Sequence, residues 1–249
     1  GKSPMTLFAG LGATSAVLML VFKDTILGLA AGVRLTSNDM LHKGDWITVK
    51  SVDANGIVED MSLTTVKVRN FDNTIVTISP ATLVNGSFQN WIGMQKSGGR
   101  RVKRIVYFDF RSIQLVDETL KQTLLAKHFA TEDSFKLKES LQKAIEKDRE
   151  EGKDIEDLKN PAALAPTNLQ LYRRFMEKYL RQRPEVNTEL TLMVRHMEAT
   201  QCGLPIEFYF FIKDKVWVNY EHILADIMEH AYALANEFGL KIYEQYPEQ

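Results

Sequence analysis

The feature that most constrains this chain is an uncharged, apolar run near its start, from Met5 to Phe22. A helix rises about 1.5 Å per residue, so this run would reach roughly 27 Å, close to the hydrocarbon thickness of a bilayer. A secretory signal fits poorly, because Lys23 and Asp24 follow where a small-residue cleavage site should lie. A buried helix of a soluble protein is the other alternative. The run predicts one membrane-spanning helix.

Small side chains recur along one side of this predicted helix, at spacings of three and four residues. They are Ala9, Gly12, Ala13 and Ala16. Small residues let membrane helices approach closely. A lone span would not need such a face, whereas a ring of identical helices would. We therefore expect several copies of the chain. Because the sequence begins Gly1-Lys2 without an initiator Met, we expect it to be part of a longer protein with earlier segments.

A second helix is predicted to follow the membrane run. Lys23 and Asp24 are too polar for the centre of a bilayer, so we expect the chain to break there. An amphipathic helix over about residues 25–40 would then lie at the membrane interface. Gly28 and Gly32 continue the small-residue spacing and would be further flexible points. These two helices form a predicted first region, residues 1–43.

From Gly44 the hydrophobic pattern alternates, which is typical of strands. Four strands are predicted, at residues 46–49, 57–61, 65–69 and 75–78. Asn55-Gly56 and Asp72-Asn73 suit the turns between them, because these residues tolerate positive φ. The pattern predicts a small β-barrel-like domain over residues 44–95. Such a unit is marginal alone and would gain from packing against copies of itself.

An ordered set of short motifs runs through residues 5–91. It comprises Leu29-Ala30-Ala31-Gly32, Gly44-Asp45, Gly56-Ile57-Val58-Glu59, Thr65, Val68-Arg69, Asp72-Asn73, Ile78 and Asn90-Trp91. This set resembles the bacterial mechanosensitive channel of small conductance family, and most nearly its miniconductance type. Two places depart from the family pattern. Ile78-Ser79-Pro80 stands where Ile-Pro-Asn is usual, and Lys23-Asp24 stands where the pore helix often carries Gln-Gly.

The resemblance implies a subunit of a homoheptameric ion channel that membrane tension opens. It would lie in the bacterial inner membrane, with its later domains in the cytoplasm, and release ions and small solutes during hypo-osmotic shock. Membrane lipids and other copies of the chain would be its partners. The predicted pore-lining residues are Ala9, Gly12, Ala13, Ala16 and Leu20, and Leu20 would carry most of a dewetting seal. The predicted hinge residues are Lys23, Asp24, Gly28 and Gly32.

Residues 96–249 show the order β-α-β-β-α-β of a ferredoxin-like domain. Predicted elements are strands at 102–110, 190–199, 204–212 and 240–243, and helices at 112–129 and 220–238. Gly239 would close the last helix. Residues 130–187 read as a charged helical insertion, which is either a solvated hairpin or a partner-binding arm. The predicted fold class is therefore a membrane helix, a small all-β domain and an α/β domain.

Several other functions lack support in the sequence. A net charge of −1 disfavours a nucleic-acid binder, although the basic run Lys96–Arg104 fits either a solvated linker or a contact with lipid headgroups or nucleic acid. The one cysteine, Cys202, excludes a disulfide framework, and we expect it to be buried. His222, Asp226 and His230 are too far apart along a helix for one metal ion. We find no catalytic set and expect no cofactor, metal or enzyme activity. A single-span scaffold and a soluble binding module remain the alternatives.

Overall fold

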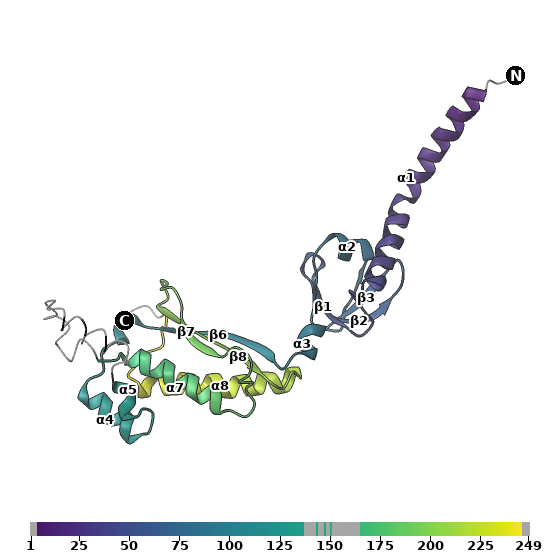
Figure 1. The fold of residues 1–249 in the computed structure, drawn as a ribbon. Helices are drawn as coiled ribbons and strands as arrows, with labels where there is room; N and C mark the ends of the chain where they lie inside the picture. The colour runs from purple at the N-terminus through teal and green to yellow at the C-terminus, as the bar shows by residue number, and fades with distance from the viewer. Residues whose placement is uncertain (1–3, 137–142, 144–146, 148–149, 151–164, 246–249) are drawn as a thin grey trace. The chain divides into compact units, whose positions relative to one another are not determined.

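A computed structural model describes residues 4–136, 143, 147, 150 and 165–245 of the chain. It divides into two compact units, residues 1–96 and 97–249. Each unit is described by itself, and Figure 1 shows the ribbon of both.

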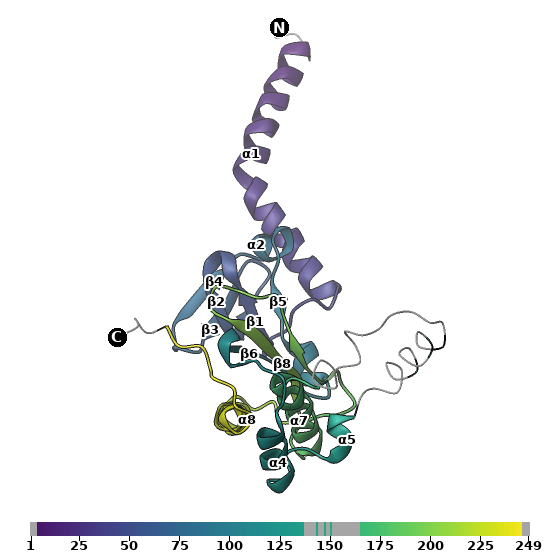
Figure 2. The ribbon, with the colours of Figure 1, turned by 90° about the vertical axis from the view of Figure 1, so that its left-hand side faces the viewer.

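The first unit begins with one long helix, α1 (Pro4–Ser37). The predicted break at Lys23-Asp24 is wrong, because the helix runs through both residues without interruption. Lys and Asp cost a helix only a few tenths of a kcal/mol each, roughly, and neither removes a backbone hydrogen bond as proline does. Figure 2 shows that α1 instead changes direction near its middle. The helix is therefore bent but unbroken.

A five-stranded antiparallel sheet with strand order β4-β3-β2-β1-β5 follows α1. Its elements are β1 (Trp46–Val49), η1 (Lys50–Val52), β2 (Ala54–Met61), β3 (Val66–Asn70), β4 (Ile75–Ile78), α2 (Pro80–Asn85), β5 (Gln89–Asn90) and α3 (Ile92–Lys96). All four predicted strands are confirmed, and their side chains alternate between more and less buried positions. The turn predicted at Asn55-Gly56 is wrong, because β2 begins at Ala54 and both residues pair with β1; η1 and Asp53, whose φ is +51°, form that turn instead. The unusual Ile78-Ser79-Pro80 begins α2: the Ser79 hydroxyl accepts a hydrogen bond from the Thr82 backbone N–H (3.2 Å), and Pro80 starts the helix.

The second unit contains a three-stranded antiparallel sheet with order β6-β8-β7. Its strands are β6 (Arg100–Phe108), β7 (Met193–His196) and β8 (Leu204–Ile212). A single antiparallel bridge, Phe108 to Ile242, extends the sheet beyond β6, so the predicted last strand is reduced to one bridge. Numbered along the chain, with the bridge at Ile242 as the fourth strand, the strands lie side by side in the order 4-1-3-2, which is that of a ferredoxin-like sheet.

The first predicted helix of this unit is shorter than expected, and the last ends as expected. The helices are η2 (Phe110–Ser112), α4 (Glu118–Ala126), α5 (Glu132–Phe135), α7 (Asn168–Gln182) and α8 (Trp217–Glu237). The helix predicted at 112–129 starts later, because the Asp117 carboxylate accepts the Leu120 backbone N–H (2.7 Å) and so caps α4. Gly239, with φ of +67°, follows the end of α8 as predicted.

Helix α7 lies within residues 130–187, which read as an insertion from the sequence, but it belongs to the core. Leu171, Tyr172, Met176 and Leu180 are buried in the same cluster as the sheet and α8. The Tyr172 hydroxyl donates to the Ala231 carbonyl oxygen (2.7 Å), and both α7 and α8 cover one side of the sheet in Figure 1. The insertion interpretation is therefore wrong for α7. Much of the rest of the range, 137–142, 144–146, 148–149 and 151–164, lies outside the described residues.

Candidate pore helix and its junction with the β domain

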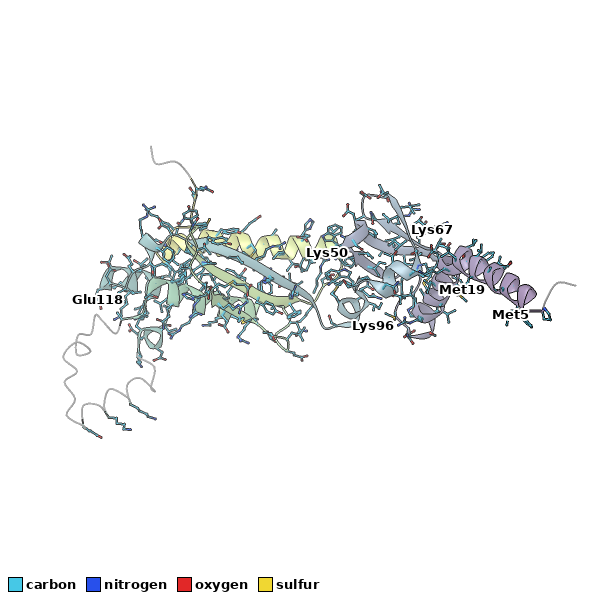
Figure 3. The ribbon with its side chains drawn as sticks, turned by 90° about the horizontal axis from the view of Figure 1, so that it is seen from above. Met5, Met19, Lys50, Lys67, Lys96 and Glu118 are labelled. Carbon is cyan, nitrogen blue, oxygen red and sulfur yellow. The ribbon has the colours of Figure 1, made fainter. Side chains whose placement is uncertain are left out.

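The upper half of α1, residues 8–22, exposes large apolar side chains around its whole circumference. Phe8, Leu11 and Leu20 are 71%, 65% and 74% exposed. Figure 1 shows no other described element of the first unit beside this stretch, and Figure 3 labels Met5 and Met19 along it. Water does not stabilise so large an exposed apolar surface. By length and composition the helix is able to cross a membrane.

The predicted pore-lining residues all lie in this free stretch. Because α1 is continuous, Ala9, Gly12, Ala13, Ala16 and Leu20 project from one side of it, at helical spacings of three and four residues. All five are exposed. A Cβ added to Gly12 would meet nothing within 4 Å, so a neighbouring helix has room to approach this side. Their role in a pore stays a prediction.

The predicted hinge residues divide into two kinds. Lys23 and Asp24 are exposed, and a Cβ on Gly28 would meet nothing within 4 Å. Gly32, in contrast, is buried, and a Cβ there would collide with the backbone carbonyl oxygen of Leu63, in the turn between β2 and β3. Gly32 therefore permits a close approach of α1 to the sheet. The sequence singled out this glycine but gave no sign of the contact with Leu63.

The last turns of α1 are built into the core of the β domain. Leu35 and Leu41 are 0% and 1% exposed, and they belong to one apolar cluster with Ile47, Val58 and Val68. Leu35 comes from the last turn of α1, Leu41 from the segment that follows the helix, and the other three from β1, β2 and β3. The helix end is therefore packed so that it cannot move without disturbing this core.

A buried carboxylate fixes the segment between α1 and β1. Asp45 is 6% exposed and its Oδ2 accepts hydrogen bonds from the His42 backbone N–H (3.0 Å) and from Asn90 Nδ2 (2.7 Å). Asn90 also donates to the Met40 carbonyl oxygen (3.3 Å). This network ties the helix end to β5, about 50 residues later in the chain. Asp45 and Asn90 drew attention in the sequence only through the family motifs, and their contact was not predicted.

Comparison with known proteins agrees with this geometry. Residues 24–93 match the family model of the mechanosensitive ion channel β-domain. These residues are therefore similar to a mechanosensitive ion channel β-domain. The small-conductance mechanosensitive channel MscMJ of Methanocaldococcus jannaschii is 34% identical over 90 residues, which are 36% of this chain and 25% of that protein. An uncharacterized MscS family protein of Helicobacter pylori is 27% identical over 128 residues, 50% of this chain and 20% of that protein.

The crystal structure of Helicobacter pylori MscS in its closed state has a similar fold. Its TM-score is 0.60 at 12% sequence identity, covering 100% of this chain and 74% of that one. The predicted fold class, a membrane helix with a β and an α/β domain, is confirmed. The chain spans about a quarter or less of the curated relatives it matches. Its likeness to the miniconductance type stays a prediction.

The range that matches the channel β-domain model includes the junction between α1 and the sheet. It begins at Asp24, so Gly32, Leu35 and the contact with Leu63 lie within it. Residues 9–20, with the predicted pore lining, precede it. The similarity to the channel β-domain thus includes the lower half of α1, whereas the upper half is described only by its own exposed apolar side chains.

The other residues considered from the sequence form no site. Among the described residues, no group of three or more His, Cys, Asp and Glu side chains is placed to hold a metal ion. His230 instead stacks on Tyr179, with ring centroids 5.4 Å apart. Cys202 is exposed, so its predicted burial is wrong: it lies in the turn between Thr200 and Gly203. Most of the basic run is the start of β6 rather than a linker, and Lys103 pairs there with Glu207 (3.6 Å).

Proposed function

We propose that this chain is a subunit of a homo-oligomeric ion channel that opens under membrane tension. The observation that carries the proposal is a single helix with two different halves. Its upper half exposes apolar side chains, and its lower half is anchored in an MscS-family β domain. Tension favours the state of larger membrane area, and a helix fixed at one end converts that preference into a movement of its free end.

The proposed location is the bacterial inner membrane, with the β and α/β domains in the cytoplasm. Lipid acyl chains would cover the bulky side of α1, where Leu11, Leu18 and Phe22 are more than half exposed. The small side would face neighbouring subunits. Lys23 and Asp24 are exposed on the same helix and would lie near the membrane interface, because charges are costly within the hydrocarbon.

Self-association, proposed as seven copies, is supported by a second exposed surface. On the outer face of the β sheet, Trp46, Ile57, Arg69 and Ile75 are paired in one row across four strands. Ile57 and Ile75 are 37% and 51% exposed. Three of the four side chains are apolar, and the fourth, Arg69, is paired with Glu59 (2.6 Å). An exposed, largely apolar row on a small sheet is a surface that another copy would cover. The domain division proposed at residues 43 and 95 places this row wholly within the β domain.

The proposed gate is Leu20, one turn beyond Ala16 on the small side of α1. A ring of leucines closes a pore by excluding water rather than by filling the opening. Ions and small solutes would pass when the ring widens, which relieves pressure during hypo-osmotic shock. The gate needs no cofactor and makes no covalent bond, so the proposed role is that of a channel and not of an enzyme, and no nucleic-acid partner is invoked.

Solute release from liposomes tests this function. The full chain is reconstituted into liposomes loaded with potassium glutamate, and the external osmolarity is then lowered abruptly. A tension-gated channel releases solute during the osmotic downshift, and the amount released increases with the size of the downshift. A single-span scaffold or binding module would insert into the same liposomes and release none, and a soluble module would remain outside the membrane fraction. Either outcome would refute the channel.

A further inference from the structure

A cavity in the α/β domain has the chemistry of a site for a small organic anion. It lies between the α4–α5 connection and one side of α7, with a volume of about 280 Å³. Helix α7 contributes a stripe at helical spacing, which includes Arg174, Phe175, Lys178 and Tyr179. The connection contributes residues between His128 and Ser134. The volume is near the lower end for small-molecule sites.

The charge of the lining is one-sided. Arg174 and Lys178 lie one helical turn apart on the cavity wall. No aspartate or glutamate is among the described residues that line the cavity, and neither cation has a carboxylate within ion-pair distance in the described part of the chain. The nearby Asp133 is paired with Lys136 instead (2.7 Å). Two cations that converge without a counter-charge attract an anion.

Hydrogen-bond donors remain available in the cavity. One guanidinium nitrogen of Arg174 makes a long contact with the Ser134 carbonyl oxygen (3.5 Å), which leaves its other N–H groups for a ligand. The Thr131 and Ser134 hydroxyl oxygens lie 3.2 Å apart. Only one of their two protons can lie between them, so the second is available to an acceptor. Guanidinium, ammonium and hydroxyl donors together suit a phosphate or carboxylate group.

The remaining wall is aromatic and held in place. Phe129 and Phe175 contact edge to face, with centroids 5.2 Å apart. Tyr179 is stacked on His230 from α8 at 5.4 Å. Rings that are fixed by such contacts offer an apolar surface to a planar group without losing rotamer freedom on binding. We propose that this cavity binds a small organic phosphate or carboxylate that carries a ring. The proposal is independent of the channel function.

Calorimetric titration of the full 249-residue chain in detergent tests this site, with phenyl phosphate, inorganic phosphate and phenol as probes at fixed ionic strength. We expect phenyl phosphate to bind more tightly than either inorganic phosphate or phenol. It alone carries both an anionic group for Arg174 and Lys178 and a ring for the aromatic wall. The variant Arg174→Gln/Lys178→Gln should lower its affinity at least about tenfold, the effect of losing a charge-assisted hydrogen bond. Lys178→Gln alone alters an exposed side chain and keeps the test valid if the double variant fails to fold.

Arg181→Gln is the matched control, because Arg181 lies on the same helix, outside the lining, and pairs with Glu177 (3.1 Å). It should change the affinity by less than about twofold, as substitutions away from a site usually do. Failure of the folded wild-type chain to bind phenyl phosphate would overturn the proposal. An equal loss in Arg181→Gln would also overturn it, because the effect would then be general charge. Equal affinity for inorganic phosphate and phenyl phosphate would overturn the role of the aromatic wall.

Discussion

The two halves of α1 belong to one helix and yet meet opposite conditions. Around Leu20 the side chains are exposed and apolar, whereas Leu35 is completely buried by the β domain. The glycines show the same contrast: Gly28 has open space around it, and Gly32 touches the Leu63 carbonyl group. The comparison indicates that the lower half is fixed by packing within the subunit, while the upper half has no such packing among the described residues. Substitutions in matched positions of the two halves can break or sharpen this distinction.

The largest effect is expected at Leu35. Leu35→Ala should lower the free energy of unfolding of the β domain by about 2–5 kcal/mol, because it opens a cavity in a closed core. Leu18→Ala, in the free half, should change it by less than about 0.5 kcal/mol. Urea unfolding followed by the fluorescence of the stacked Trp46 and Trp91 pair measures both, in a Trp217→Phe background. Equal losses in the two variants would show that the free half is also packed within the subunit.

Gly32 and Gly28 form the next matched pair. Gly32→Ala should destabilise the junction by about 1–3 kcal/mol, because the methyl group must displace the Leu63 turn. Gly28→Ala meets no atom and should stabilise the helix by up to about 1 kcal/mol through better helix propensity. Hydrogen exchange of the β2 and β3 amides reports the first change. We also expect Gly32→Ala, and not Gly28→Ala, to shift the pressure at which the proposed channel opens. A shift in Gly28→Ala alone would place the bend that works in opening in the upper half of α1.

Disrupting the hydrogen bonds of Asp45 should lower the free energy of unfolding by a smaller amount. Asn90→Ala removes the side-chain donor to Asp45 and leaves that buried carboxylate with the His42 backbone N–H as its remaining hydrogen bond in the network. The expected cost is about 1–3 kcal/mol, with the lower end favoured if water reaches the site. The same Trp46 and Trp91 fluorescence measures it. If Asn90→Ala leaves the free energy of unfolding unchanged, this contact does not help to hold the helix end.

Leu20→Ser should have the smallest effect on folding and a large one on function. The side chain is 74% exposed, so the stability of the β domain should change by less than about 0.5 kcal/mol. A hydroxyl in the proposed seal allows water to enter, so liposomes that hold this variant should leak without an osmotic downshift. Leu18→Ser, on the other side of α1, is the control. Equal leakage from both variants would show that Leu20 does not form the gate.

Much of the fold follows from local patterns in the sequence. Residues 46–49, 75–78 and 204–212 were predicted as strands with the bounds that the structure has, since each is a short alternating or apolar run between turn residues. The insertion interpretation fails for α7 because it joins this helix to the charged run from Glu132 to Lys159, whereas Tyr172 and Met176 of α7 are buried in the core. The predicted break at Lys23-Asp24 failed because polar residues in a helix cost little.

The site was only partly predictable for a different reason. The small side of α1 follows from spacing along one helix, which the sequence contains in full. The contacts of Gly32 with Leu63 and of Asp45 with Asn90 join residues that lie far apart in the chain. No local pattern specifies such pairs. The anion cavity likewise depends on α7 lying against the α4–α5 connection, which only the packed domain provides.

Patch recording of the reconstituted chain under graded suction tests the central claim most directly. We predict discrete conductance steps whose open probability rises with suction, and a lower suction threshold for Leu20→Ser than for Leu18→Ser. A chain that is present in the patch and carries no current at any suction up to rupture of the membrane would contradict the account.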